Sequence, residues 1–431
     1  MKFFKNKKQF YSLKNLSHNS FYIGIFFLPS ALPISAVFLL ISIINVLFKS
    51  GNTYLKNKWN FPIIVFFALM TFSCIRNSLD FVLNENFSRE ISSIWLDLFN
   101  WFPLFLLFWS SQIYTDNEIK REKCARIILI STLPVFASCI GQYWLGWQGP
   151  ISTLNGLIVW FMRPISETEN LTGLFSNSNY LGCWLSVLFP FAAVSLSYKK
   201  NDLKKFCIIL LNLIFIYLLL LTSSRNSLVS ILITLSFLKL KIIFFTLLIF
   251  LLTPLIWNYF FPKLFFDFGK SFLPINLINR FDFGTNIKFF SSTRFEIWNK
   301  TLFFISNRPL LGWGSGLFPI LYISSTGLFN AQHAHNLPLH LAFTYGVPLA
   351  ISITAMVFVI VLKSYRVIFK NNSNNNNINK AWFLSSLVMI YWHISDIPYF
   401  DGKISILSWI LLSGLCSIIK ESEEKKITIL N

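Results

Sequence analysis

Residues 206–238 read FCIILLNLIFIYLLLLTSSRNSLVSILITLSFL, and this stretch decides the fold. It is a long apolar run that is interrupted by one polar segment, residues 223–227. A helix needs about 20 apolar residues to cross a bilayer, and the part before the polar segment comes close to that length. The stretch therefore predicts two membrane helices, one of them short, joined by a polar turn.

The whole chain has the composition of this stretch. Hydrophobic residues make up 54% of it, charged residues only 13%, and the mean hydropathy is +0.58. That is too little charge to cover a water-soluble globule of 431 residues. Further apolar segments lie at 61–75, 93–114, 125–145, 177–198, 242–261, 337–363, 381–399 and 403–419. The sequence predicts an all-α polytopic membrane protein.

The breaks between the apolar segments alternate in character. One set is rich in Lys and Arg: 115–124, 199–205, 239–241, 363–380 and 420–426. The other set is longer, or more acidic and aromatic: 76–92, 146–176, 222–226, 262–336 and 400–402. Because basic loops stay in the cytoplasm, the alternation predicts about 12 transmembrane helices with both chain ends inside.

The start of the chain has to satisfy this alternation. With the N-terminus inside, residues 49–60 are also inside only if residues 21–48 cross the membrane twice. We therefore expect a hairpin that begins before Phe21 and turns near Pro29 and Pro33. A single kinked span is the alternative.

The same pattern divides the chain into three parts of one integrated membrane domain. Residues 1–261 form an N-terminal transmembrane bundle of about nine helices, residues 262–336 a large outer loop, and residues 337–431 the last transmembrane helices with a cytoplasmic tail. The outer loop is too rich in apolar residues to be disordered. Within it, the apolar positions of 293–306 predict an amphipathic helix, with Ser292 as N-cap and Pro309 as stop.

Two compositional features have structural explanations. The net charge of +19 is dispersed in short loops, which favours membrane topology over nucleic acid binding. The six cysteines lie mostly inside apolar segments without CxxC spacing, so we expect small core residues rather than disulfides or a metal site.

Histidine is concentrated at one place. Three of the five histidines lie between His333 and His340, and the segment Ala331-Gln-His-Ala-His-Asn336 ends the outer loop. A histidine can exchange a proton near neutral pH, which makes His335 a candidate base. A His-X-His pair could also bind a metal. No cysteine is nearby and the closest acidic residues are distant in sequence, so we predict no metal; His333 and His340 could simply be structural.

Two arginines lie on the same predicted side of the membrane as this segment. Arg225 is close to the membrane boundary, where a charge is costly unless it is paired or faces a wet cavity; an interfacial arginine that reaches into water is the alternative. Arg294 opens the amphipathic helix, and a guanidinium can bind phosphate oxygens with two hydrogen bonds. With His335, the two arginines would suit a diphosphate leaving group and an alcohol acceptor.

The glycines of the outer loop mark a turn. Gly312, Gly314 and Gly316 permit a tight backbone conformation. The turn either approaches a ligand or is needed for loop geometry alone.

These residues together resemble the O-antigen ligase and O-antigen polymerase superfamily of bacterial membrane glycosyltransferases. The resemblance covers roughly residues 170–360 and rests on a few short motifs. They are Gly173-Leu-Phe-Ser-Asn-Ser-Asn179, Ser223-Ser-Arg225, Arg294-Phe-Glu-Ile-Trp298, Pro309-Leu-Leu-Gly-Trp-Gly-Ser-Gly316 and His333-Ala-His-Asn336, the last followed after nine residues by Gly346. The family pattern has a second glycine three residues later, where this chain has Leu349.

The resemblance implies a function. Members of the superfamily take a glycan from an undecaprenyl diphosphate carrier at the periplasmic face of the inner membrane. Ligases pass it to a lipid A-core sugar, polymerases to another carrier-linked repeat, and related enzymes to protein hydroxyls. The expected partners are thus a lipid-linked oligosaccharide donor, a glycan or lipid A-core acceptor and the bilayer, without metal or other cofactor.

The resemblance also implies roles for individual residues. His335 would be the catalytic base, and Arg225 and Arg294 would bind the diphosphate. Four further residues are supporting candidates on the predicted outer side: Arg163, Arg280, Glu296 and His333. Asn336 and Gly346 would shape the loop and the turn after it.

Two other functions are compatible with a polytopic membrane protein. A transporter of a small anion such as inorganic carbon would place charged groups at mid-membrane on broken helices, whereas this chain carries few charges in its spans. A flippase would need a large polar cavity. The sequence favours an enzyme, and it leaves ligase and polymerase open because both need the same leaving-group chemistry.

Overall fold

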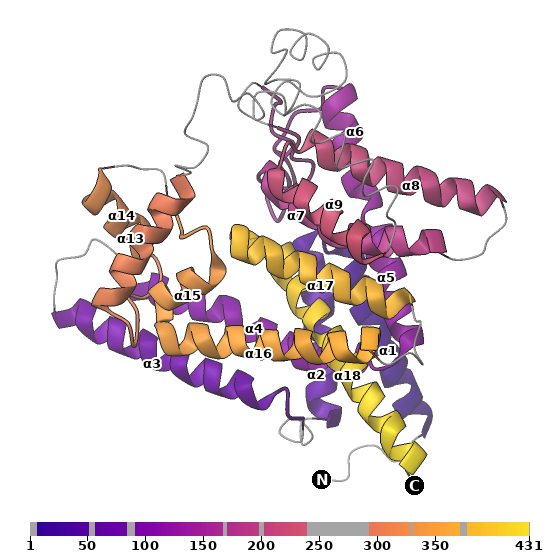
Figure 1. The fold of residues 1–431 in the computed structure, drawn as a ribbon, viewed down its shortest axis with the longest axis horizontal. Coiled ribbons are helices and arrows are strands. Elements are labelled where there is room, and N and C mark those ends of the chain that lie inside the picture. The colour runs from indigo at the N-terminus through magenta and orange to yellow at the C-terminus, as the bar shows by residue number, and fades with distance from the viewer. Residues whose placement is uncertain are drawn as a thin grey trace.

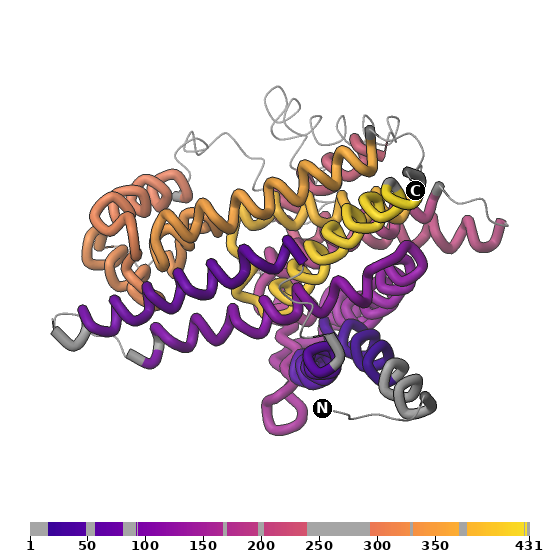
Figure 2. Tube along the Cα trace, turned by 90° about the horizontal axis from the view of Figure 1, so that it is seen from below, coloured from indigo at the N-terminus to yellow at the C-terminus, as the bar shows by residue number. Residues whose placement is uncertain are grey.

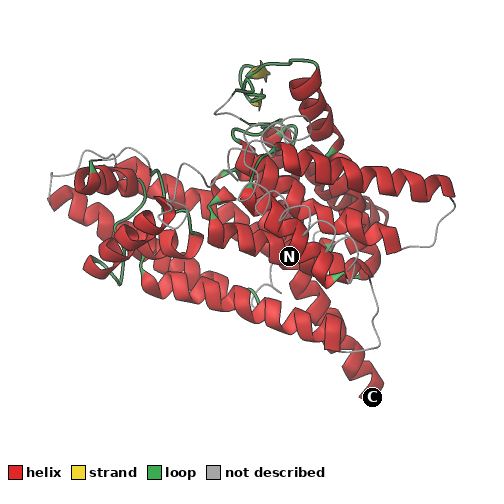
Figure 3. Ribbon diagram, turned by 45° about the horizontal axis from the view of Figure 1, so that its top comes forward, coloured by secondary structure: helices red, strands yellow, loops and turns green. Residues whose placement is uncertain are grey.

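The computed structural model describes residues 7–50, 57–83, 91–166, 170–197, 202–238, 293–327, 331–370 and 377–430. Helices dominate these residues (Figure 3). In chain order they are α1 Lys7–Phe27, α2 Leu32–Ser50, α3 Phe61–Leu83, α4 Ile91–Tyr114, α5 Glu118–Ser131, α6 Leu133–Trp144, α7 Ser178–Val194, α8 Asp202–Leu221, α9 Arg225–Phe237, α13 Thr293–Asn307, α14 Leu317–Thr326, α15 Leu337–Tyr345, α16 Val347–Tyr365, α17 Asn377–Ser395 and α18 Gly402–Leu430.

Several of these helices have the length and composition of membrane spans, which confirms the all-α membrane class. Six qualify among the described residues: 61–80, 94–114, 118–144, 202–221, 347–369 and 402–425. Shorter apolar helices include α2, α7 and α9. The total of about 12 spans stays a prediction, because the segment 242–261 and the first part of the expected outer loop, 262–292, lie outside the described residues.

The N-terminal apolar segment folds as two packed helices, α1 and α2, as the hairpin hypothesis requires. The chain turns between Phe27 and Leu32, and α1 extends well before Phe21. The Ser35 hydroxyl donates to the Gly24 carbonyl oxygen at 2.7 Å. A side chain at Gly24 would collide with Leu39, so the two helices pack too closely there to accept one. Whether both helices cross the membrane stays a prediction.

The centre of the molecule is formed by α4, α16, α17 and α18 (Figure 1). The largely buried α18 packs against α4, α16 and α17, and α17 packs in turn against α7 and α9. At one end of α17 and α18, the fully buried Arg121 donates to Asn379 at 3.0 Å and to Glu421 at 2.6 Å. The other ends of these two helices, near Asp396 and Gly402, carry the candidate site.

Helices α13, α14 and α15 form a lobe at one end of the molecule (Figure 2). As the sequence predicts, a helix occupies the 293–306 region: α13 ends at Asn307, before Pro309, and packs against α15. The expected single apolar face is not seen, because Phe295, Leu302 and Phe303 are exposed. Its proposed cap, Ser292, lies outside the described residues.

The glycine-rich loop after α13 lies against the junction of α15 and α16. Gly312, Gly314 and Gly316 all have positive φ. The backbone N–H of Trp313 donates to the Phe343 carbonyl at 2.7 Å, and the N–H of Gly314 to the Thr344 carbonyl at 2.9 Å. These hydrogen bonds tie the turn to protein backbone.

Gly346 permits the same close approach from the other side. It has a φ of 98°, and a Cβ there would lie 2.0 Å from the Leu310 carbonyl oxygen. The spacing from His335 to Gly346 is therefore the cap residue Asn336, the length of α15 and the glycine that ends it.

One element was not expected from the sequence. Residues Ile151–Thr153 (β1) and Ile158–Trp160 (β2) pair as an antiparallel hairpin within the predicted outer loop 146–176. The indole N–H of Trp160 donates to the Ser30 carbonyl at 2.8 Å, which attaches the hairpin to the turn between α1 and α2.

Candidate active site

The candidate site is built around Asp396, the residue directly after α17. Its side chain is buried, and both of its oxygens accept hydrogen bonds. Oδ1 accepts from His335 Nδ1 at 2.8 Å and from the Ile397 N–H at 2.9 Å. Oδ2 accepts from Asn179 at 3.2 Å and from Arg294 at 3.4 Å. Four segments of the chain thus meet at one carboxylate.

His335 reaches this carboxylate because the loop 331–336 is fixed at its end. Asn336 caps α15 by accepting from the Leu339 N–H at 3.0 Å, and Pro338 suits the first turn of that helix. The Asn336 amide also donates to the Ile394 carbonyl at 2.9 Å, which ties the loop to the end of α17. His335 itself has a φ of 49°, a left-handed conformation that non-glycine residues seldom adopt.

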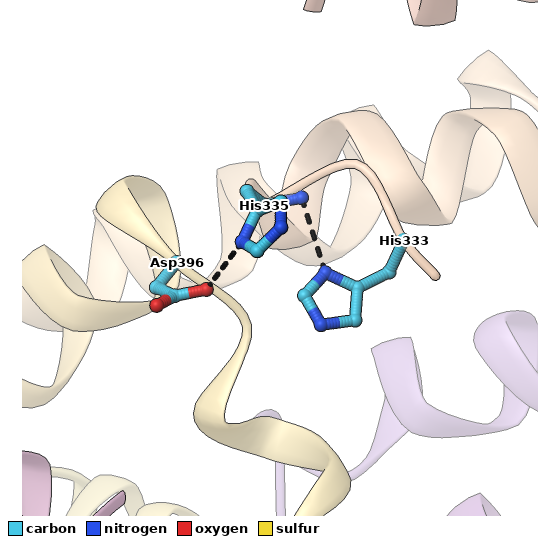
Figure 4. Close-up of side chains that lie close together, drawn as sticks. All are labelled: His333, His335 and Asp396. Carbon is cyan, nitrogen blue, oxygen red and sulfur yellow. Dashed lines mark hydrogen bonds and ion pairs between the residues drawn. The ribbon is translucent and has the colours of Figure 1, made fainter. Parts of the chain in front are cut away.

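The hydrogen bond to Asp396 sets the chemical role of the imidazole (Figure 4). A carboxylate accepts the proton on Nδ1, so in the neutral ring Nε2 carries a lone pair. Within the described part of the chain, Nε2 has no hydrogen-bond partner, and the ring is partly exposed. His335 is thereby oriented to accept a proton from a bound molecule.

The surroundings keep Asp396 ionised. Burial alone raises the pKa of a carboxyl group. Here the hydrogen bond from His335, the positive charges of His335 and Arg294, and the Ile397 N–H outweigh burial and hold the pKa of Asp396 below its usual value. An ionised Asp396 can orient His335 at any pH near neutrality.

Arg294 joins the site from the first turn of α13. Its Nη1 donates to the Ser395 carbonyl at 2.6 Å and its Nη2 to Asp396. A cation at a helix N-terminus opposes the helix dipole, so this position does not stabilise α13. A guanidinium has five N–H donors, which leaves donors on Arg294 for a further anion.

Arg225 approaches the same end of α17. It is the first residue of α9 and is exposed. Its neighbour Asn226 accepts a hydrogen bond from the Tyr391 hydroxyl at 3.1 Å. The positive charges of Arg294 and Arg225 both act on Tyr391, so each arginine lies in the neighbourhood of this residue. The fold therefore brings Arg225, Arg294 and His335 into one region, from separate parts of the sequence.

His333 lies beside His335 and is partly buried. The two rings are 4.3 Å apart, and His333 Nδ1 accepts the backbone N–H of His335 at 3.3 Å. Burial, and then the positive charge of His335, lower the pKa of His333 to about 4. His333 is therefore neutral near pH 7 and supports the loop conformation of its neighbour.

This lowered pKa predicts a pH-dependent stability. Between pH 6.5, the usual histidine value, and about pH 4, the unfolded chain binds a proton that native His333 resists. Stability from this residue is thus lost as the pH falls through that window. Comparing the Tm of the wild type with that of His333→Gln from pH 7 to pH 4, we expect the difference to shift against the wild type. Parallel curves would contradict this account.

The site could also hold a cation. His333, His335 and Asp396 offer ligand atoms that all lie within 4.8 Å of one another. The sequence argument that no acidic residue is near the histidines therefore fails in space. The guanidinium of Arg294 occupies the second oxygen of Asp396, however, and its positive charge disfavours a metal ion at the same carboxylate.

The other candidate residues lie at different distances from this centre. Glu296 is exposed on α13 and acts electrostatically on Tyr322 of α14. Arg163 has an exposed side chain, and its backbone bonds to Gln142 and Thr172 near α6. Arg280 lies outside the described residues.

Sequence reasoning missed three residues of the site: Asp396, Tyr391 and Asn179 as a contact of Asp396. Asp396 falls within 381–399, which reads as an apolar span. An acidic residue inside an apolar segment is a functional candidate by default, and that signal could have found it. Asn179 belongs to a recognised motif, but its contact with Asp396 joins positions 217 residues apart.

A comparison with known protein families finds a match for part of the chain. No curated protein matches the chain. Residues 210–354, which include Arg225, Arg294 and His335, match the sequence model of the family described as O-antigen ligase. The matched region contains three of the site residues, so this part of the chain is similar to the O-antigen ligase family.

Proposed function

We propose that the protein transfers a glycan from an undecaprenyl diphosphate carrier to an acceptor hydroxyl group at the periplasmic face of the bacterial inner membrane, in surface-polysaccharide assembly. One observation carries the proposal: a histidine whose Nδ1 is held by a buried carboxylate, with an arginine on the same carboxylate. The family match supports the general reaction class.

The proposed reaction is a single displacement at the anomeric carbon. The acceptor hydroxyl oxygen forms the new bond to that carbon, while the bond from carbon to the carrier diphosphate breaks. Nε2 of His335 takes the hydroxyl proton, and Asp396 stabilises the imidazolium that results. Arg294 and Arg225 stabilise the negative charge that develops on the departing diphosphate.

The acceptor distinguishes two versions of this function. A ligase uses a lipid A-core sugar, and this version follows the description of the matched family. A polymerase uses a second carrier-linked repeat, and the position of Leu349, where the ligase pattern has glycine, leaves room for it.

Surface glycans of a deletion strain test both versions. Loss of a ligase leaves carrier-linked glycan of normal length, whereas loss of a polymerase leaves single unpolymerised repeats. The wild-type gene restores the glycan profile, and a gene carrying Arg126→Gln, an exposed residue of α5, serves as the control. An unchanged glycan profile in the deletion strain would refute the proposed function.

We also propose that the transfer needs no metal, because Arg294 and Arg225 supply the positive charge at the leaving group. Treating the purified protein with a chelator should leave the transfer rate unchanged. Added Zn²⁺ should inhibit the transfer. A zinc ion at this site would compete with Arg294 for Asp396, and with the substrate proton for His335. A rate that falls with the chelator and recovers with a divalent cation would contradict the proposal.

A further inference from the structure

A second arginine cluster lies at the other end of α13. Arg308 follows the last residue of this helix, and its Nη1 is 3.2 Å from Asp80 Oδ2 on α3. Arg76, one turn earlier on α3, pairs with the other oxygen of the same carboxylate. The cluster thus combines two guanidinium groups with one carboxylate and carries a net positive charge.

The two guanidinium groups are accessible, although the carboxylate between them is not. The side chains of Arg76 and Arg308 are 51% and 33% exposed, and that of Asp80 is 17% exposed. Within the described residues, each arginine has its ion pair with Asp80, which uses only part of its donor capacity. An anion can therefore approach the outer side of both arginines.

The cluster is held in position from the glycine-rich loop. The Arg308 guanidinium lies 4.4 Å above the centre of the Trp313 ring. Trp313 is itself fixed, because its indole N–H donates to the Phe304 carbonyl at 2.8 Å and its backbone N–H to Phe343. A guanidinium stacked on a fixed aromatic ring presents its N–H edge in one plane, which is the geometry that binds a phosphate group.

Helix α13 links this cluster to the candidate active site. Arg294 stands in its first turn and Arg308 just after its last, about 20 Å apart at a rise of about 1.5 Å per residue. One helix therefore positions two cationic groups, Arg294 beside Asp396 and Arg308 beside Asp80 of α3. A reaction between two lipid-borne molecules that each carry a phosphate can use two separate cationic sites, one for each substrate.

We propose that Arg76 and Arg308 form a second anion site, which binds the phosphate of the acceptor lipid. This assignment rests on the proposed function, in which Arg294 and Arg225 serve the donor. The acceptor phosphate belongs either to a second carrier diphosphate or to a phosphorylated lipid sugar. Asp80 holds the two arginines together and lowers the net charge of the cluster, and so it lowers the affinity of the site for an anion.

Binding of inorganic pyrophosphate tests the site without relying on catalysis. The full chain carrying Arg294→Gln is purified in detergent, so that the donor site contributes little, and its Tm is followed as pyrophosphate is added. We expect a concentration-dependent rise that Arg76→Gln and Arg308→Gln each abolish. Arg126→Gln, which removes an exposed arginine from an ion pair with Glu122, should leave it unchanged.

The Asp80→Asn variant distinguishes an anion-binding cluster from one that only connects α3 to α13. It removes the competing carboxylate, so pyrophosphate should bind roughly tenfold more tightly even if the variant has a lower starting Tm. A purely structural cluster predicts a lower Tm and no gain in binding. That result, or a rise in Tm that survives Arg76→Gln and Arg308→Gln, would overturn the proposal, and neither outcome would affect the proposed function.

Competition between two lipids tests whether the site binds a carrier-type diphosphate or a phosphate of the bilayer. Farnesyl diphosphate, a short-chain analogue of the carrier, should displace pyrophosphate from the Arg294→Gln protein. The headgroup of phosphatidylglycerol, supplied in nanodiscs, should not. Displacement by phosphatidylglycerol alone would assign the cluster to the bilayer and overturn the acceptor assignment.

Discussion

Replacing His335 with glutamine is expected to abolish glycan transfer while the protein still folds and enters the membrane. Glutamine is similar in size and can still bond to Asp396, but it cannot take a proton from the acceptor hydroxyl. Loss of a general base typically costs about 10²–10⁴-fold in rate. The measurement is the initial rate of transfer from carrier-linked glycan by purified protein, with the protein amount checked on a gel.

A matched histidine provides the control for this variant. His18 on α1 packs against Tyr114 at the end of α4 that lies away from Asp396. His18→Gln should retain the wild-type rate. If His335→Gln also transferred glycan at the wild-type rate, His335 would not be the base.

Replacing Asp396 with asparagine should cost nearly as much, although Asp396 does not touch the acceptor. The asparagine amide can donate to His335 Nδ1, which would shift the ring proton to Nε2 and remove the lone pair that the reaction needs. The change also removes the negative charge that holds Arg294. We expect a loss of roughly 10²–10⁴-fold, by analogy with carboxylate-oriented histidines in general.

The pH dependence of the rate distinguishes this positioning role from a structural one. An ionised Asp396 stabilises the imidazolium, so the apparent pKa for activity should fall in Asp396→Asn, together with the maximal rate. A structural defect would lower the rate without moving that pKa. Asp116→Asn, an exposed residue paired with Lys120 at the far end of α4, should change neither quantity.

Polar residues in an apolar chain made much of the site predictable. Arg225, Arg294 and His335 stand out because a membrane protein with 13% charged residues places few charges near its spans. The helix over 293–306 could be predicted from its apolar spacing and from Pro309, and α13 occupies those residues.

The parts that could not be predicted depend on contacts between distant segments. Asp396 and His335 are 61 residues apart in the chain, and no local sequence pattern predicts that they pair. The glycine-rich loop reads as a turn, but its partner, the backbone of Phe343 and Thr344, becomes visible only in the fold. The β1–β2 hairpin is too short, at three residues per strand, to give a recognisable alternation.

The central claim is that His335 performs chemistry while Arg294 binds the diphosphate. It is tested most directly by measuring, for His335→Gln and Arg294→Gln side by side, the Kd for the carrier-linked donor and the single-turnover rate at saturating donor. We predict that His335→Gln keeps a Kd within about threefold of the wild type and loses turnover. Arg294→Gln should bind the donor roughly tenfold or more weakly. The reverse pattern, with donor binding lost in His335→Gln and unchanged in Arg294→Gln, would contradict the assignment of both residues.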